Sequence, residues 1–201
     1  VRLAQRRRLL PFLALTWLLA AVAPAFALES IVVNDIADDH IIKASHLEIL
    51  LDPDDSVRMD DLLRPNAPAF TPLQQDVLNL GHTDDSVWLH LRVQPATDTR
   101  DNLVWLLQLK YPLLDRVDIH PVRNGKADPP FRIGYSIPMA ERPMRHRFFV
   151  QPLQVQPGET LDIYVNIMRK GGAVQAPMSL STPTAFFLAE TASNHMMGIY
   201  F

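Results

Sequence analysis

The sequence predicts an all-β fold, either a sandwich or a barrel. Short apolar runs recur roughly every ten residues, and Pro, Gly, Asn and Asp separate them, which is the spacing of all-β domains. Turn signals such as Asn124-Gly125 and Pro157-Gly158 fall between these runs. Helix signals are scarce and short. No repeat or long linker divides the chain, so one domain is expected.

Nine apolar runs have the length and composition of strands. They are His46–Leu51, Val77–Leu80, Ser86–Val93, Leu103–Tyr111, Arg116–Val122, Phe131–Tyr135, Arg147–Leu153, Leu161–Met168 and Met178–Ser181. One helical turn is expected at Met59–Leu63 and a short helix over Thr184–Thr191, after a proline. The pair Gly171-Gly172 is expected to form an unusual backbone turn.

The run SVWLHLRV, residues 86–93, has two chemically different faces. Side chains alternate between the two faces of a strand. One face carries only the apolar side chains of Val87, Leu89, Leu91 and Val93, as expected for a core. The other face carries Trp88, His90 and Arg92. Because an indole gains nothing from water, this second face is expected to contact another sheet, a neighbouring molecule or a ligand.

Residues 1–27 have the pattern of a secretory signal peptide. Four arginines and no acid precede an apolar run from Leu9, and Ala25-Phe26-Ala27 supplies a small-residue cleavage site before Leu28. The alternative is an uncleaved membrane anchor, because the apolar run is almost long enough to span a bilayer. The mature domain is then residues 28–190. Residues 191–201 form an apolar C-terminal segment.

The composition of the mature chain excludes several classes of partner. Removing four arginines from 19 basic residues leaves 15 against 22 acidic residues, a formal charge of −7 over 174 residues. This charge argues against nucleic acid and anionic membrane surfaces. The chain has no cysteine, so it has no disulfide, no thiolate metal site and no thiol nucleophile.

Catalytic and nucleotide-binding signatures are missing, and no enzyme activity is predicted. No metal site is predicted either, because the seven histidines are scattered. The run from Asp52 to Ser56 begins like a calcium loop, but Val57 and Leu63 stand where an EF-hand needs Gly and Glu. Calcium bound by irregular acidic loops remains an alternative. A hydrolase is the competing class, with acids such as Asp84, Asp85, Asp115 or Asp118 as its chemistry.

The order of the motifs resembles the type 2 extracellular domain of the 7TMR-DISM receptors. The resemblance spans about residues 40–188 and lies in the order of five motifs. These are Gly81 to Leu91, Trp105 to Leu107, Leu114 to Val117, Pro157-Gly158, and Met168-Arg169 with Gly171-Gly172. At the position of His82 the family has an aromatic residue more often than a histidine. At the position of His120 the family often has Tyr, so this histidine is a departure. Both affect the expected binding face rather than the fold.

The resemblance implies a jelly-roll β-sandwich similar to carbohydrate-binding modules, acting as a periplasmic input domain. In that family the domain precedes seven transmembrane helices and a histidine kinase or diguanylate cyclase, which serve two-component or cyclic-di-GMP signalling. The end of the chain, HMMGIYF, is similar to the start of a first membrane helix. The expected chain is therefore a fragment, a truncated reading frame or a stand-alone soluble form, tethered to the membrane only through a region it lacks.

The expected ligand is a carbohydrate or another small polar molecule bound on an aromatic sheet face. Indoles stack on sugar rings and arginines bind carboxylates or hydroxyls bidentately. The candidate residues are Trp88, Trp105, His90, Arg92, Tyr164, Arg147 and Arg169, with Tyr135 as a further aromatic. Two alternatives remain: both tryptophans belong to the core, because large aromatics are mostly buried, or the face is a homodimer contact.

Overall fold

The computed structural model describes residues 28–198 except residues 37 and 76, and of residues 194–198 only the backbone. The predicted signal peptide and residues 199–201 lie outside the described residues. The strands are β1 (Ile31–Val33), β2 (Asp39–Ile41), β3 (Glu48–Asp52), β4 (Thr71–Pro72), β5 (Leu78–Thr83), β6 (Ser86–Pro95), β7 (Leu103–Leu109), β8 (Arg116–Arg123), β9 (Lys126–Ala127), β10 (Phe131–Ile133), β11 (Phe149–Val155), β12 (Leu161–Met168), β13 (Gly172–Ala176) and β14 (Met178–Ser181). The helices are α1 (Met59–Leu62) and α2 (Pro183–Gly198), with 3-10 turns at Ala44–His46 and Met139–Glu141.

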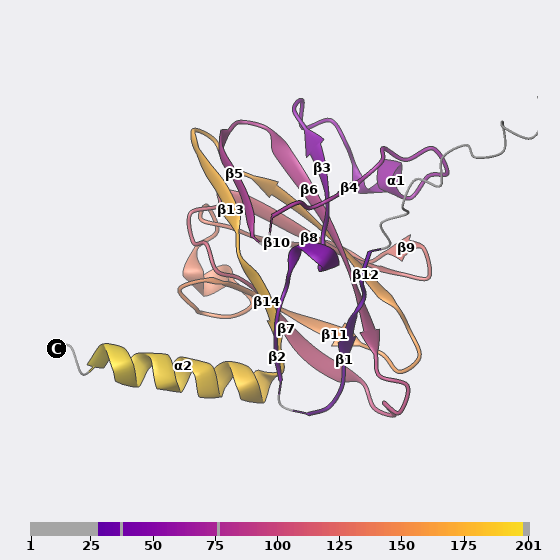
Figure 1. Cartoon of the computed structure of the whole chain (residues 1–201). Helices are drawn as coiled ribbons and strands as arrows, with labels where there is room; N and C mark the ends of the chain where they lie inside the picture. The colour runs from indigo at the N-terminus through magenta and orange to yellow at the C-terminus, as the bar shows by residue number, and fades with distance from the viewer. Residues whose placement is uncertain (1–27, 37, 76, 199–201) are drawn as a thin grey trace, which may run out of the picture.

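The described strands form two larger sheets and one small one (Figure 1). The large sheet has the order β10-β8-β12-β6-β3-β4, with β1 added to β6 and β9 added to β8. The second sheet has the order β11-β7-β14-β2, and β13 pairs with β5. Every described pair is antiparallel except β1 with β6. The fold is therefore mostly β and antiparallel, as the sequence predicts.

One core fills the space between the two larger sheets. The apolar face of β6 lies in it, and Leu89 and Leu91 are fully buried. Trp105 and Leu107 of β7, in the second sheet, belong to the same core cluster. The alternation of residues 86–93 thus orients β6 as predicted, with its apolar face inward. Its other face points away from the core and is called the outer face below.

All nine predicted strands are present, with their ends shifted by a few residues. The predictions missed β1, β2, β4, β9 and β13, which are short and lack a long apolar alternation. The expected turn at Gly171-Gly172 is only half right, because Gly172 already begins β13. The C-terminal helix extends to Gly198, well beyond the predicted Thr191, because no proline or glycine interrupts it before that residue.

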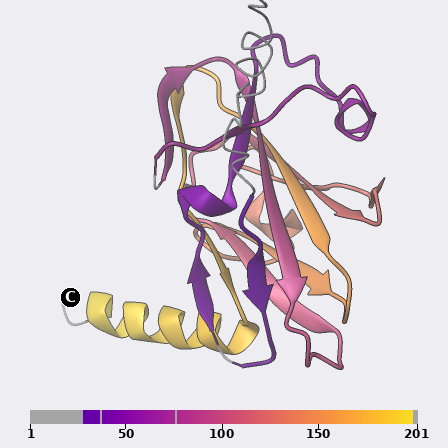
Figure 2. The ribbon, with the colours of Figure 1, turned by 45° about the vertical axis from the view of Figure 1, so that its right-hand side comes forward.

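The two helices differ in how they contact the sheets. Figures 1 and 2 show α2 projecting from one end of the sheets, and only its first turns pack on them, through Phe186 against Leu106 and Val150. The short helix α1 lies on the outer face of the large sheet, where Met59 and Leu62 are buried. Within the part of the chain that the structure describes, no helix combines the length and apolar character needed to cross a membrane.

Candidate ligand site on the outer face of the large sheet

The outer face of the large sheet carries two rows of polar and aromatic side chains. Residues paired in register on neighbouring strands form each row. The first row runs from β10 to β3 through Arg132, Asp118, Asn166, Trp88 and Leu50. The second row runs from β8 to β3 through His120, Tyr164, His90 and Glu48. Side chains far apart in the sequence thus meet on one surface.

Trp88 lies beneath α1 and is not open to solvent. Only 3% of the residue is exposed, and its indole belongs to an apolar cluster with Met59 and Leu62 of α1. Its other flank meets His120, with ring centroids 5.4 Å apart and planes tilted by 39°. The expectation of an open indole face for sugar stacking is therefore wrong. The one hydrogen-bond donor of its indole, Nε1–H, is buried as well.

A cavity of about 270 Å³ lies between the outer face and the segment that includes α1. We call it the outer-face cavity, and the residues that line it are Asp55, Val57, Arg58, Met59, Trp88, Arg116, Asp118, His120, Arg132 and Asn166. Its volume is close to the lower limit of ordinary ligand pockets, roughly 300–1,000 Å³. Charged and polar side chains form most of its wall, so the cavity suits a small polar ligand.

Two ion pairs organise the wall of the outer-face cavity. Arg132 binds Asp118 bidentately, through Nε to Oδ1 at 2.6 Å and Nη2 to Oδ2 at 3.0 Å. Arg116 donates from Nη2 to Asp55 at 2.9 Å and to Asn166 at 3.0 Å. Asn166 in turn donates to Ser86 within the sheet. Because each guanidinium is fixed by two acceptors, the wall is preorganised before any ligand arrives.

Two buried donors of the wall lack an acceptor among the described residues. These are Nε1 of Trp88 and Nε of Arg116. The nearest carboxylate oxygen to the latter is Oδ2 of Asp118, at 3.6 Å, too far for a hydrogen bond. Burial lowers the pKa of His120 despite the nearby carboxylate of Asp118, so its imidazole is neutral at pH 7. A ligand that offers acceptors would satisfy both orphan donors.

The second row contains a histidine between two carboxylates. Nδ1 of His90 lies 3.2 Å from Glu48 and Nε2 lies 2.8 Å from Asp162. Asp162 also accepts from Nε of Arg92 at 2.8 Å. Burial opposes ionisation of Asp162, but the hydrogen bonds from His90 and Arg92 outweigh it and lower the pKa of this carboxyl. This network fixes β3, β6 and β12 to one another beside the cavity.

The structure brings together four of the seven predicted site residues and separates the other three. Trp88, His90, Arg92 and Tyr164 share the outer face. Trp105 is 0% exposed in the core between the sheets, so its expected place on the same face is wrong.

The two predicted arginine anchors also lie elsewhere. Arg147 contacts Glu190 and Ser193 of α2. Arg169 donates to the carbonyl of Leu113 and lies over the ring of Tyr111. Neither arginine lines the outer-face cavity. Tyr135, the further aromatic candidate, is 67% exposed and does not line it either.

Sequence reasoning missed most of the polar wall. Arg58, Arg116, Arg132 and Asn166 are not among the residues that the sequence predicts as ligand contacts. His120 was expected to affect the binding face but was not a predicted site residue, and Asp118 was only a candidate hydrolytic acid. One signal was present: in residues 116–120, polar side chains alternate with the buried Val117 and Ile119. That alternation places the polar members on the same outer face as Trp88.

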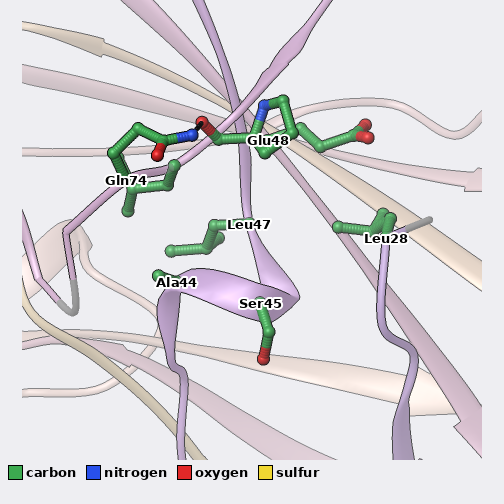
Figure 3. A pocket seen from close by; sticks show the side chains of 8 residues that line it. Leu28, Ala44, Ser45, Leu47, Glu48 and Gln74 are labelled. Carbon is green, nitrogen blue, oxygen red and sulfur yellow. Dashed lines mark hydrogen bonds between the residues drawn. The ribbon is translucent and has the colours of Figure 1, made fainter. Parts of the chain in front are cut away.

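A second cavity of about 270 Å³ lies near the N-terminal end of the described chain (Figure 3). Its lining is mainly apolar, from Leu28, Ala44, Leu47, Pro72 and Leu73, with Ser45, Glu48 and Gln74 as polar members. Figure 3 shows Leu28 across the pocket from Ala44 and Leu47. The cavity has few converging donors or acceptors, so it is the weaker candidate for binding a polar ligand.

The acidic loops are occupied by internal hydrogen bonds. Asp52 accepts from the backbone amides of Ser56 and Val57, and Asp84 accepts from the amide of Gly171. Among the residues that the structure describes, no three His, Asp or Glu side chains are grouped to hold a metal ion. The geometry thus gives the calcium alternative no support.

Fold and site together define a mostly β domain with a small polar cavity on one sheet face. The family model described as 7TMR-DISM extracellular 2 matches residues 44–182 of this chain. The chain therefore belongs to this family of extracellular domains of membrane receptors, as the order of its motifs predicts. In that family the domain is the extracytoplasmic input part of the receptor.

The other comparisons add little. No curated protein matches the chain. Two solved structures of β-glucuronidase from Ruminococcus gnavus, one in complex with C6-substituted uronic isofagomine and one without ligand, are similar with TM-scores of 0.40 and 0.39 and identities of 12% and 11%. Each alignment covers 79% of this chain and 31% of the other, so this chain spans less than a third of those enzymes.

Proposed function

We propose that the chain is the periplasmic ligand-sensing domain of a bacterial membrane signalling receptor, and that it binds a small polar ligand, such as a carbohydrate, in the outer-face cavity. Its sheets are then the two layers of a jelly roll. One observation carries the proposal: the wall of a ligand-sized cavity holds two buried donors, Trp88 Nε1 and Arg116 Nε, without acceptors. Orphan buried donors are costly, and a bound ligand is one way to satisfy them.

The cavity also lies between two parts of the domain, so ligand binding can change how these parts are arranged. One wall belongs to the large sheet, through Trp88 and Arg116, and the other to the α1 segment, through Arg58 and Met59. The ion pair between Asp55 and Arg116 already joins the two walls. A ligand that contacts both walls would favour the conformation in which they are close, which is how a binding domain converts affinity into a change of state.

The competing class, a hydrolase, has weaker support from the geometry. Asp118 is tied to Arg132 by two hydrogen bonds, Asp115 accepts from the amide of Lys170, and Asp84 accepts from Gly171. These three carboxylates are thus already occupied by hydrogen bonds within the protein. The homodimer alternative was based on an exposed aromatic face. The indole of Trp88 is instead covered by α1 of the same chain, so that reason no longer applies.

Tryptophan fluorescence tests the proposal with a built-in control. Trp88 lines the outer-face cavity, whereas Trp105 lies in the core and lines none of the described cavities. The purified chain would be titrated with sugars, hydroxy acids and amino acids while its emission is recorded. We expect a ligand to change the emission of the unmodified protein and of Trp105→Phe, and to leave that of Trp88→Phe unchanged. A response that survives in Trp88→Phe and disappears in Trp105→Phe would contradict the proposed site.

A further inference from the structure

The outer-face cavity contains more cationic than anionic groups. Three guanidinium groups line it, from Arg58, Arg116 and Arg132, against two carboxylates, from Asp55 and Asp118. Arg116 and Arg132 each pair with one of these carboxylates. Because His120 is neutral at pH 7 and the other lining residues carry no charge, one positive charge in the wall lacks a partner within it.

The unmatched charge is that of Arg58. Its Nη1 donates to the backbone carbonyls of Asp55 and Val57, at 2.8 and 3.3 Å. No side-chain ion pair of Arg58 occurs among the described residues. The residue is exposed, so a ligand can approach its guanidinium from solvent. The guanidinium of Arg58 is therefore held in the cavity wall by backbone carbonyls, and no carboxylate side chain among the described residues accepts a hydrogen bond from it.

The other free groups of the wall are donors as well. Nε1 of Trp88 and Nε of Arg116 are buried and have no acceptor, and neither group can itself accept a hydrogen bond. A ligand that satisfies all three residues must offer several oxygen acceptors and, beside Arg58, a negative charge. Trp105 Nε1 is buried without an acceptor too, but it faces no described cavity, so no ligand can reach it.

We propose that the outer-face cavity binds a sugar acid of monosaccharide size, with its carboxylate on Arg58 and its ring or hydroxyl oxygens accepting from Trp88 and Arg116. This inference rests on the proposed function and specifies the class of ligand. A guanidinium fork matches the planar carboxylate in shape. One unmatched positive charge suits a monoanion better than a phosphate, which carries about −1.5 to −2 at pH 7. A volume of about 270 Å³ holds one sugar ring rather than a chain of them.

Calorimetry on the purified full chain tests the inference with sugars that differ at one carbon. The probes are D-galacturonate and D-glucuronate, their neutral parents D-galactose and D-glucose, and D-galactose 6-phosphate. We expect at least one uronate to bind at least tenfold more tightly than its neutral parent, and the phosphate to bind no more tightly than that uronate. Binding of neither uronate, or equal binding of acid and parent, would overturn the inference.

Two arginines of the same segment provide matched variants. Arg58→Gln removes the unmatched charge, whereas Arg64→Gln removes an exposed arginine that pairs with Asp61 and does not line the cavity. Both variants change the net charge equally. We expect Arg58→Gln to weaken uronate binding by about 10–100-fold, the range for a hydrogen bond between charged groups, and Arg64→Gln to leave it within about twofold. Equal losses in both variants would overturn the specific role of Arg58.

A third variant separates the loss of contact from a loss of folding. Arg58→Lys keeps the charge and removes the fork, so we expect intermediate affinity and an unchanged melting temperature. If Arg58→Lys binds no uronate although it melts like the unmodified chain, a charge at residue 58 is not what selects the ligand. If a neutral sugar changes Trp88 emission and binds at least as tightly as its uronate, the proposed function stands and the sugar-acid inference fails. If no probe or screened compound changes that emission, both fail.

Discussion

The imidazole of His90 stacks on the phenol ring of Tyr164, with centroids 4.4 Å apart and planes within 10° of parallel. The two residues are register partners on β6 and β12, so the stack joins the two central strands of the large sheet. Phe70 covers both rings edge-on. Because His90 also lies between Glu48 and Asp162, the stack and the ion network form one structural unit next to the outer-face cavity.

We expect Asp162→Asn to destabilise the chain in a pH-dependent way. The pKa of Asp162 lies below its ordinary value of 3.8, so the folded state favours the carboxylate. Its stabilising contribution is present above pH 3.8 and is lost as the pH falls through the lower folded-state value. Urea unfolding at pH 7 should show a loss of roughly 1.5–3 kcal/mol, and the difference should shrink toward pH 2–3. Asp98→Asn, at an exposed loop position, is the control and should change stability by less than about 0.5 kcal/mol. An equal loss at both pH values would contradict this account of Asp162.

Truncating a buried side chain of a strand is expected to cost much more stability than truncating an exposed one. Leu89 is 0% exposed in the core, so Leu89→Ala should cost about 2–5 kcal/mol through lost burial and a residual cavity. Val104 of β7 is 45% exposed, so Val104→Ala should change stability by less than about 1 kcal/mol. Thermal unfolding of both variants measures this. Similar losses in the two would show that the inner and outer faces of these strands are wrongly assigned.

Gly134 is expected to tolerate no side chain. Its φ is +147°, and a Cβ there would lie 2.4 Å from the backbone carbonyl oxygen of Asp115. Gly134→Ala should therefore cost at least about 1–3 kcal/mol, and it should weaken ligand binding because Arg132 is only two residues away. Gly158→Ala is the matched control: its φ is +71° with no atom within 4 Å, so only the backbone penalty of about 1–2 kcal/mol applies. A milder effect at Gly134 than at Gly158 would contradict the close approach.

We expect Glu190 to help hold α2 against the residues just before β11. This carboxylate lies 3.0 Å from Nε2 of His146 and 3.4 Å from Nη2 of Arg147. Glu190→Gln should increase hydrogen exchange in α2 several-fold while changing global stability by less than about 1 kcal/mol, because the contacts are near the surface. Exchange that rises equally in β6 and β12 would mean that the substitution loosens the whole domain.

The sequence predicts local features of this fold better than it predicts the site. The alternation at Leu89 and Leu91 is enough to orient β6, because one residue pattern determines which face is buried. The location of Trp105 requires knowing that β7 belongs to the second sheet, and the location of Arg147 requires knowing where α2 packs. Both facts come from long-range pairing.

The cover over Trp88 is also a long-range feature. Residues near Met59 reach the outer face only because the chain between β3 and β4 folds back over it. From the sequence alone, the apolar residues between β3 and β4 therefore indicate only an isolated helical turn and not a cover over Trp88. The motif order identified the family, whereas the charged wall of Arg58, Arg116 and Arg132 could be recognised only once three distant segments met.

A ligand in the outer-face cavity is expected to accept a hydrogen bond from Nε1–H of Trp88. The indole N–H resonances of Trp88 and Trp105 report this directly in a proton–nitrogen correlation spectrum. Trp88→Phe and Trp105→Phe assign the two peaks among the three tryptophans of the chain. During titration with a uronate we predict that the Trp88 resonance moves downfield as its Nε1–H gains an acceptor, while the Trp105 resonance stays in place. A ligand that binds by calorimetry but leaves the Trp88 resonance unmoved would contradict the claim.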